Sequence, residues 1–202
     1  MGLDLLAIGG GSVGRKTETA GTVINRLVPP KPNAFTRVTT LRYTAAGTAH
    51  IVTAMAPLGK TTLSAAAAAS QAVIVLTAQP VTDGTNNVAA NDWLAWDNGD
   101  GTYSFGQVSS VSGLTITMTA NLPKAVAAGQ TVWMFGAIGD TNPYTGFVHP
   151  GFTGTASATE TYTDTVAGVF SSNNKFEPLL LQSDNATAAG TMQLVSYVHT
   201  LN

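Results

Sequence analysis

The sequence predicts an all-β protein in three parts: an extended N-terminal arm, a small β-barrel module and a C-terminal β-rich module. Composition is the first reason, since Thr, Ala, Gly and Val supply 98 of the 202 residues, and small or β-branched side chains suit sheets and tight turns. Short β-type runs also recur along the chain between turn-forming residues. Finally, residues 114–119 alternate apolar side chains with Thr, the pattern of a strand with one face toward water.

Residues 1–33 are predicted as the extended arm. They contain Gly9, Gly10 and Gly11 and the run Pro29-Pro30-Lys31-Pro32, with little periodic apolar pattern. Pro-rich segments favour an extended polyproline conformation, and we expect the arm to become ordered only on a partner.

Charge is distributed unevenly along the chain. Residues 1–60 hold seven basic and two acidic residues, a net charge of +5, whereas residues 61–202 hold two basic and nine acidic residues, a net charge of −7. The basic segment is suited to an acidic partner surface, although a solvated tail with scattered charges explains the same pattern. The basic residues are spaced rather than clustered, and only Phe35 and Tyr43 could stack on bases among them, so we expect no nucleic acid partner.

Residues 34–137 are predicted as the small β-barrel with a preceding hairpin. The hairpin would pair residues 35–43 with residues 50–55 around Ala46-Gly47. A barrel of five or six strands would follow, with Ser112-Gly113 as a tight turn. The β-type runs are residues 61–64, 72–77, 93–96, 102–111, 114–119 and 131–135.

The remaining residues divide into a linker and a second β module. Residues 138–152 are predicted as the linker, because Gly and Pro interrupt them repeatedly. Residues 153–202 are predicted as the C-terminal β-rich module, with strands over residues 159–169, 176–182 and 192–201.

The chain offers few groups for catalysis, and we expect no enzyme, no cofactor and no metal. It has no Cys, which excludes disulfide frameworks, Cys-ligated metals and thiol nucleophiles. His50, His149 and His199 lie in three separate segments, and no Gly-x-Ser-x-Gly motif is present. The apolar residues 1–8 include Asp4 and lack a positive flank, so we expect neither a signal peptide nor a membrane partner.

Two short motifs resemble ligand-binding loops but depart from them. Residues 59–62, Gly-Lys-Thr-Thr, end like a phosphate-binding loop, yet Ala54 occupies the position of the required first Gly. Residues 97–102, Asp-Asn-Gly-Asp-Gly-Thr, resemble a calcium loop, yet Gly99 replaces a ligand and Gln107 replaces the closing Glu. We interpret the first as a turn into a strand and the second as a hairpin turn.

Five aromatic residues fall inside the strongest strand patterns: Trp93, Trp96, Tyr103, Phe105 and Trp133. Packing in the barrel core is the favoured interpretation. An aromatic platform for a sugar is the alternative.

Several stretches together resemble the small β-barrel modules of tailed-bacteriophage virion proteins. They are residues 92–103 (DWLAWDNGDGTY), residues 108–116 (VSSVSGLTI), Leu122-Pro123 and residues 127–129 (AAG), with residues 176–181 (FEPLLL) and 183–187 (SDNAT) near the end. The resemblance spans roughly residues 58–202.

Combined with the basic arm, the resemblance is greatest to capsid decoration (cement) proteins. It implies a non-enzymatic structural protein on the outer surface of the virion capsid, which binds the major capsid protein as a homo-oligomer, with a trimer favoured, and stabilises the head. We expect Arg15, Lys16, Arg26, Lys31 and Arg37 to make the attachment, and Pro29, Pro30 and Pro32 to keep the arm extended. The alternative is a tail, baseplate or fibre component that binds a host surface glycan.

Overall fold

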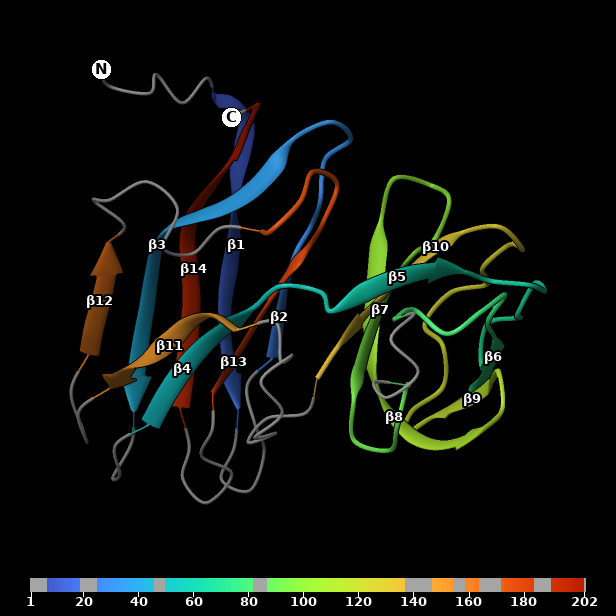
Figure 1. Cartoon of the computed structure of the whole chain (residues 1–202). Coiled ribbons are helices and arrows are strands. Elements are labelled where there is room, and N and C mark those ends of the chain that lie inside the picture. The colour runs from blue at the N-terminus through green and yellow to red at the C-terminus, as the bar shows by residue number, and fades with distance from the viewer. Residues whose placement is uncertain are drawn as a thin grey trace. The chain divides into compact units, whose positions relative to one another are not determined.

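The computed structural model describes residues 7–18, 25–45, 50–81, 87–136, 147–154, 159–163, 172–183 and 190–201. The regular secondary structure in these ranges consists of β-strands, which pair into antiparallel sheets (Figure 1). This confirms the predicted all-β fold class. No helix among the described residues is long and apolar enough to span a membrane. The chain divides into two compact units, unit 1 (Met1–Ala56 with Phe147–Asn202) and unit 2 (Pro57–Gly146).

Unit 1 consists of two four-stranded sheets. The first has the order β1-β14-β3-β12 and the second has the order β11-β4-β13-β2. The strands are β1 (Ala7–Glu18), β2 (Asn25–Val28), β3 (Phe35–Ala45), β4 (His50–Met55), β11 (Phe147–Gly154), β12 (Thr159–Thr163), β13 (Leu179–Ser183) and β14 (Gly190–Thr200).

The strand connections of unit 1 are those of a jelly roll. We number the eight strands of this unit from one to eight in chain order. One sheet then has the order 1-8-3-6, and the other has the order 5-4-7-2. Eight antiparallel strands wound into two sheets in this way form a double-sheet jelly roll. Unit 2 is inserted between its fourth and fifth strands, β4 and β11.

Strand β3 shows why these residues form a sheet with one buried face. Its inward residues are buried, among them Val38, Leu41 and Tyr43 at 0% exposure. Its register with β14 has two adjacent irregularities, because Val195 is passed over on β14 and Thr39 on β3, so each strand contains one extra residue there. The alternation therefore restarts after Thr39, and Arg42 is exposed between buried neighbours.

Unit 2 is a six-stranded sheet with the order β5-β10-β7-β8-β9-β6. The sheet curls until its two ends meet, since Ser64 N donates to Val75 O and Thr77 N donates to Thr62 O, both at 2.9 Å. The predicted barrel module is confirmed as this curled six-stranded sheet, but the predicted hairpin before it is wrong, because β3 and β4 belong to different sheets of unit 1. Its strands are β5 (Gly59–Thr62), β6 (Val73–Val75), β7 (Trp93–Asp97), β8 (Tyr103–Ser112), β9 (Thr115–Met118) and β10 (Thr131–Phe135).

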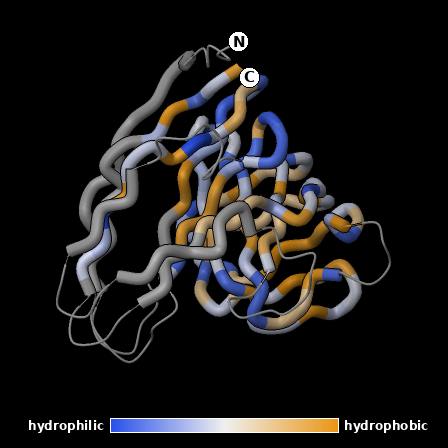
Figure 2. The backbone as a smooth tube through the Cα atoms, turned by 60° about the vertical axis from the view of Figure 1, so that its left-hand side comes forward, coloured by the Kyte–Doolittle hydropathy of each residue, from blue (hydrophilic) through white to orange (hydrophobic). Residues whose placement is uncertain are grey.

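The interior of the barrel is filled by alternate residues of these strands. Leu94, Trp96, Ile116 and Met134 belong to one buried apolar cluster, and Figure 2 shows apolar and polar segments following one another along the chain. Gly106 faces this interior, where a Cβ atom would lie 3.1 Å from Met118 Cε. Leu114 was predicted to share the buried face of residues 114–119, but it lies in the β8–β9 turn and is 37% exposed.

The structure divides the chain differently from the predicted parts. Residues 1–33 are not a separate arm in the described ranges, because β1 pairs with β14 and β2 pairs with β13. Residues 34–56 belong to unit 1 rather than to the barrel, and residues 147–152 of the expected linker lie in β11. Residues 138–146 lie outside the described residues. The reason is that the partners of β1, β3 and β4 come from the far end of the chain, which no local pattern reveals.

Candidate functional site

The residues predicted to attach the protein to a partner are spread over both sheets of unit 1. Arg15 and Lys16 lie on β1, in register with Gln193 and Met192. Arg26 lies on β2, and the Pro-rich run follows it. Arg37 lies on β3 and is half-buried. The structure therefore does not bring these residues together into one arm.

The Pro-rich run is a fixed connection between β2 and β3. His199 on β14 hydrogen-bonds through Nε2 to the carbonyl oxygen of Pro29 at 3.0 Å; since a carbonyl can only accept, this nitrogen carries a proton. Pro30 is buried, whereas Pro32 is exposed. A turn closes the run, where Ala34 N donates to Lys31 O at 3.2 Å.

A buried polar cluster holds residues 172–177 against the start of β3. Thr36 Oγ1 donates to the carbonyl oxygen of Glu177 at 2.7 Å, and Thr36 N donates to Ser172 Oγ at 2.9 Å. The Glu177 carboxylate, 6% exposed, accepts from Asn174 N and Asn174 Nδ2, both at 2.8 Å. This cluster was missed from the sequence. The groups satisfy each other, so its role is to fix the loop.

The calcium-like motif is a turn between β7 and β8. Asp97 Oδ1 accepts from Gly99 N at 2.7 Å, and Asp100 Oδ1 accepts from Thr102 N at 3.0 Å. Gly99 and Gly101 have φ angles of +84° and +80°, which glycine adopts without strain. The carboxylates thus stabilise the turn, and the described residues contain no group of three or more potential His, Cys, Asp or Glu ligands.

Asp100 is also paired with Lys124. Its Oδ2 lies 2.9 Å from Lys124 Nζ, and both side chains are about half exposed (52% and 49%). Hydrogen bonds to the carboxylate hold the pKa of Asp100 far below its usual value; the Thr102 hydroxyl makes the larger contribution and the Lys124 ammonium group the next. This pair is a surface feature in contact with water.

The phosphate-loop-like motif is strand β5. Lys60 is exposed and in register with Trp133. A Cβ atom at Gly59 would lie 2.3 Å from the carbonyl oxygen of Pro80. Close packing against Pro80 therefore explains this glycine, and the position of the motif in a strand agrees with its interpretation from the sequence.

The aromatic residues of unit 2 lie on two sides of its sheet. Trp96 is in the interior cluster, 2% exposed, which confirms its predicted core position. Trp133, on the opposite side of the sheet, is fully buried and packs against Tyr103 with ring centroids 6.0 Å apart; burial and then the charge of Asp97 raise the pKa of Tyr103. Trp93 and Phe105 are half-buried and pair at 6.0 Å.

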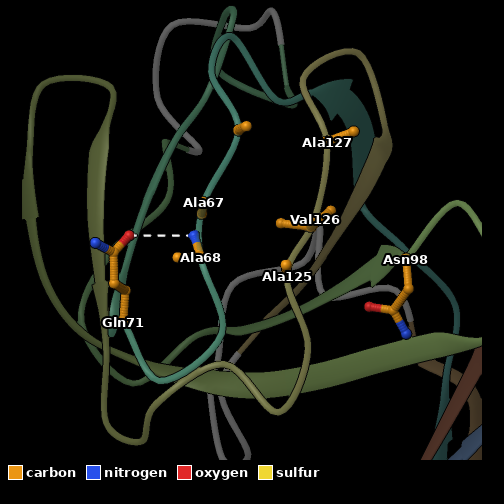
Figure 3. Close-up of a pocket in the computed structure, with 8 residues that line it drawn as sticks. Ala67, Ala68, Gln71, Asn98, Ala125, Val126 and Ala127 are labelled. Atoms are coloured by element: carbon orange, nitrogen blue, oxygen red, sulfur yellow. Dashed lines mark hydrogen bonds between the residues drawn. The ribbon is translucent and has the colours of Figure 1, made fainter.

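An open depression of about 680 Å³ lies in unit 2 (Figure 3). Two segments line it, one around Ala67 and one around Val126, and an isolated antiparallel β-bridge joins these two residues. Gln71 Oε1 accepts from Ala68 N at 3.2 Å, and Asn98 hydrogen-bonds to Thr102 and Ser104. The other lining residues are Ala66, Ala125 and Ala127. Small apolar side chains and two engaged amides provide no acid, base or nucleophile.

The three His residues lie on three strands, His50 on β4, His149 on β11 and His199 on β14. Within the described residues, the side chain of His199 has a structural role, since besides Pro29 it contacts the Tyr197 ring edge-on at a centroid distance of 5.4 Å.

The chain matches no known protein-family profile and no curated protein sequence. Two solved structures show weak structural similarity to it. One is the VP16-VP17 complex of the two major capsid proteins of bacteriophage P23-77, with a TM-score of 0.22, 11% identity and coverage of 95% of this chain and 98% of that one. The other is VP17, a capsid protein of the same phage, with a TM-score of 0.18, 9% identity and coverage of 98% and 100%.

Proposed function

We propose that this chain is a non-enzymatic structural protein of a phage virion, which binds the outer surface of the capsid and stabilises the head as a decoration protein. The observation that carries the proposal is the jelly-roll topology of unit 1, with a curled six-stranded sheet inserted between its fourth and fifth strands. Double-sheet jelly rolls occur in viral capsid and lectin domains. The step from topology to a virion role is therefore an argument by fold analogy.

The geometry of the insertion supports a protein assembled from two bodies. Met55 at the end of β4 is in register with Phe147 at the start of β11, so the chain leaves and re-enters the jelly roll at neighbouring positions. On the side of unit 2, Leu58 N donates to Met134 O at 2.8 Å. A second folded body is thus added without interrupting either set of strands.

Composition also supports a role in an assembly. Charged residues make up 10% of the chain, against roughly 25% in typical soluble domains. A free protein relies on surface charge for solubility, whereas a subunit that is permanently covered by neighbours needs less of it.

A non-catalytic role agrees with how the chain's polar groups are used. Asp97 and Asp100 stabilise a turn, Glu177 fixes a loop and His199 holds Pro29. The proposed partners are the major capsid protein and further copies of this chain, with a trimer favoured. Repeated contacts across a symmetric shell would convert modest contacts into strong attachment.

The copy number in purified virions of the phage that encodes the chain tests this proposal. Quantitative mass spectrometry would give the number of copies per major capsid subunit. We expect a ratio near one or a simple fraction of it. A few dozen copies or fewer per particle would contradict a decoration role and assign the protein to the tail or a vertex.

The second candidate is a tail, baseplate or fibre component that binds a host glycan. The half-buried pair Trp93 and Phe105 is the observation that favours it, because a partly open aromatic face can stack on a sugar ring. A glycan array probed with the full chain and with Trp93→Ala tests it. Binding that Trp93→Ala abolishes would support this function over decoration.

A further inference from the structure

We propose that Asn98, in the turn between β7 and β8, is a site of spontaneous deamidation that the folded turn keeps closed. Asn98 is the one asparagine of the chain that is followed by glycine. Gly99 has no side chain to hinder attack by its backbone nitrogen, and its backbone is free to adopt unusual conformations. The site lies in unit 2 and does not depend on the proposed virion role.

The reaction would take place between the side chain of Asn98 and the backbone of Gly99. Gly99 N loses its proton to the solvent and attacks Asn98 Cγ. A bond between this nitrogen and Cγ forms, the bond between Cγ and Nδ2 breaks, and Nδ2 takes up a proton and leaves as ammonia. Water then opens the cyclic imide at either of its carbonyl carbons, which leaves an aspartate or an isoaspartate at position 98. Gly99 is exposed, so water reaches the imide.

The turn holds the side-chain amide of Asn98 at both ends. Asn98 Nδ2 donates to Thr102 Oγ1 at 2.9 Å, and Asn98 Oδ1 accepts from Ser104 Oγ at 3.1 Å. Ser104 is buried, at 8% exposure. Attack would make Cγ tetrahedral, so both amide atoms would have to move away from these partners. The two hydrogen bonds therefore oppose the reaction.

Thr102 fixes which end of the amide faces it. The single proton of its hydroxyl is donated to the Asp100 carboxylate, which can only accept. Thr102 Oγ1 then has only lone pairs left, and it accepts from Asn98 Nδ2 and, at 3.1 Å, from Lys124 Nζ. A donor is thus required at the Nδ2 position of Asn98.

The attacking nitrogen is held as well. Gly99 N donates to Asp97 Oδ1 at 2.7 Å. The negative charge of this carboxylate opposes loss of the Gly99 proton, because a second negative charge would form beside it. Asn98 N donates to Thr102 O at 3.0 Å, which holds the backbone of the turn closed. Three hydrogen bonds, two on the amide and one on Gly99 N, therefore have to open before the ring can form.

The product would weaken the turn that had protected the asparagine. Hydrolysis replaces Nδ2 by a carboxylate oxygen, which cannot donate to Thr102 Oγ1. It also places a negative charge between Asp97 and Asp100. Asn98 lines the depression of unit 2 (Figure 3), so the same change adds a carboxylate to a surface lined mainly by alanine.

The test is the rate of deamidation at Asn98, measured by peptide mapping and mass spectrometry of the full chain at mildly alkaline pH. A hydrogen bond contributes about fivefold to an equilibrium constant, so three bonds should make the folded chain react roughly a hundredfold more slowly than the chain in guanidinium chloride. Ser104→Ala should speed the reaction of the folded chain about fivefold. Ser64→Ala is the matched control, because it removes a serine hydroxyl that donates to Val75 O at 3.2 Å elsewhere in unit 2, and it should react at the wild-type rate.

The result that overturns the proposal is an equal rate in the folded and unfolded chains, or a folded Ser104→Ala variant that reacts like the wild type. Equal acceleration by Ser64→Ala would assign the protection to the overall stability of unit 2 and would overturn the role of the turn. Calorimetric melting establishes that each variant is folded. Ser104→Cys, whose thiol is a weak donor, replaces Ser104→Ala if that variant unfolds.

A second measurement tests the effect of the product. Asn98→Asp introduces the aspartate form directly and should lower the melting temperature of unit 2 by about 4–8 °C, as expected for the loss of one hydrogen bond in a domain of this size. Asn121→Asp is the control, because Asn121 is exposed and undergoes the same change of charge. Equal melting temperatures for the two variants would show that the turn tolerates the carboxylate and would contradict the proposed effect.

Discussion

The two units differ in how far apart in the sequence their strands find partners. In unit 2, β7 pairs with β8 and β8 with β9 across short turns, although β5 pairs with β10 and β6 with β9 at longer separations. In unit 1, β1 pairs with β14 and β2 with β13, so residues near one end of the chain meet residues near the other. Local pairing leaves a signature in the sequence, whereas the non-local pairing of a jelly roll leaves none. Unit 2 should also form independently, while unit 1 needs both ends of the chain.

The largest expected effect is that of deleting residues 1–33, which tests this contrast directly. The deletion removes β1 and β2, which are edge strands of the two sheets of unit 1. We expect unit 1 to lose its cooperative fold while unit 2 remains folded. All three Trp residues lie in unit 2, so native Trp emission with loss of most far-ultraviolet sheet signal is the expected result. A truncated chain with an intact calorimetric transition for unit 1 would show that these strands are dispensable.

The sequence could predict unit 2 better than unit 1 for the same physical reason. The alternation around Ile116 and the turn residues near Gly99 and Gly113 are local, and they identified the barrel. The run Gly9–Gly11 provides no side chain to indicate that β1 is a strand. Thr36 and Glu177 bond across 141 positions, and nothing near either residue predicts the contact. The expected attachment residues were grouped by proximity in sequence, but their strands belong to different sheets.

A pair of core truncations should sharpen the comparison with the next largest effect. Leu41 on β3 and Ile116 on β9 are both fully buried, one in each unit. Leu41→Ala and Ile116→Ala should each cost about 3 kcal/mol. If the units unfold independently, each substitution lowers only the melting temperature of the unit that carries it. Trp fluorescence then reports only the unfolding of unit 2. Equal shifts of a single shared transition in both variants would contradict the independence of the units.

A smaller contrast is expected for two threonines. Thr36→Val removes the hydroxyl that donates to the buried Glu177 carbonyl at 2.7 Å, and an unsatisfied buried carbonyl should cost about 1–3 kcal/mol. Thr62→Val removes a hydroxyl that lies 2.8 Å from the Thr77 hydroxyl in an exposed position, which should cost less than about 0.5 kcal/mol. Urea denaturation of both variants measures the difference. Equal losses would mean that the Thr36 contact does not hold the loop to β3.

The smallest expected effect belongs to the exposed pair of Asp100 and Lys124. The Thr102 hydroxyl and Lys124 lower the pKa of Asp100 from its usual 3.8, so the contribution of this group to stability is present above that value and is lost as the pH falls through the lower folded pKa. Lys124→Gln should raise the pKa measured by a nuclear magnetic resonance titration of the carboxyl carbon. At neutral pH the variant and the wild type should have the same melting temperature, because water and salt weaken an exposed ion pair. A clear drop in the melting temperature of unit 2 would instead show that the Asp97–Asp100 turn depends on this charge, and that the barrel is held by its surface as well as by its core.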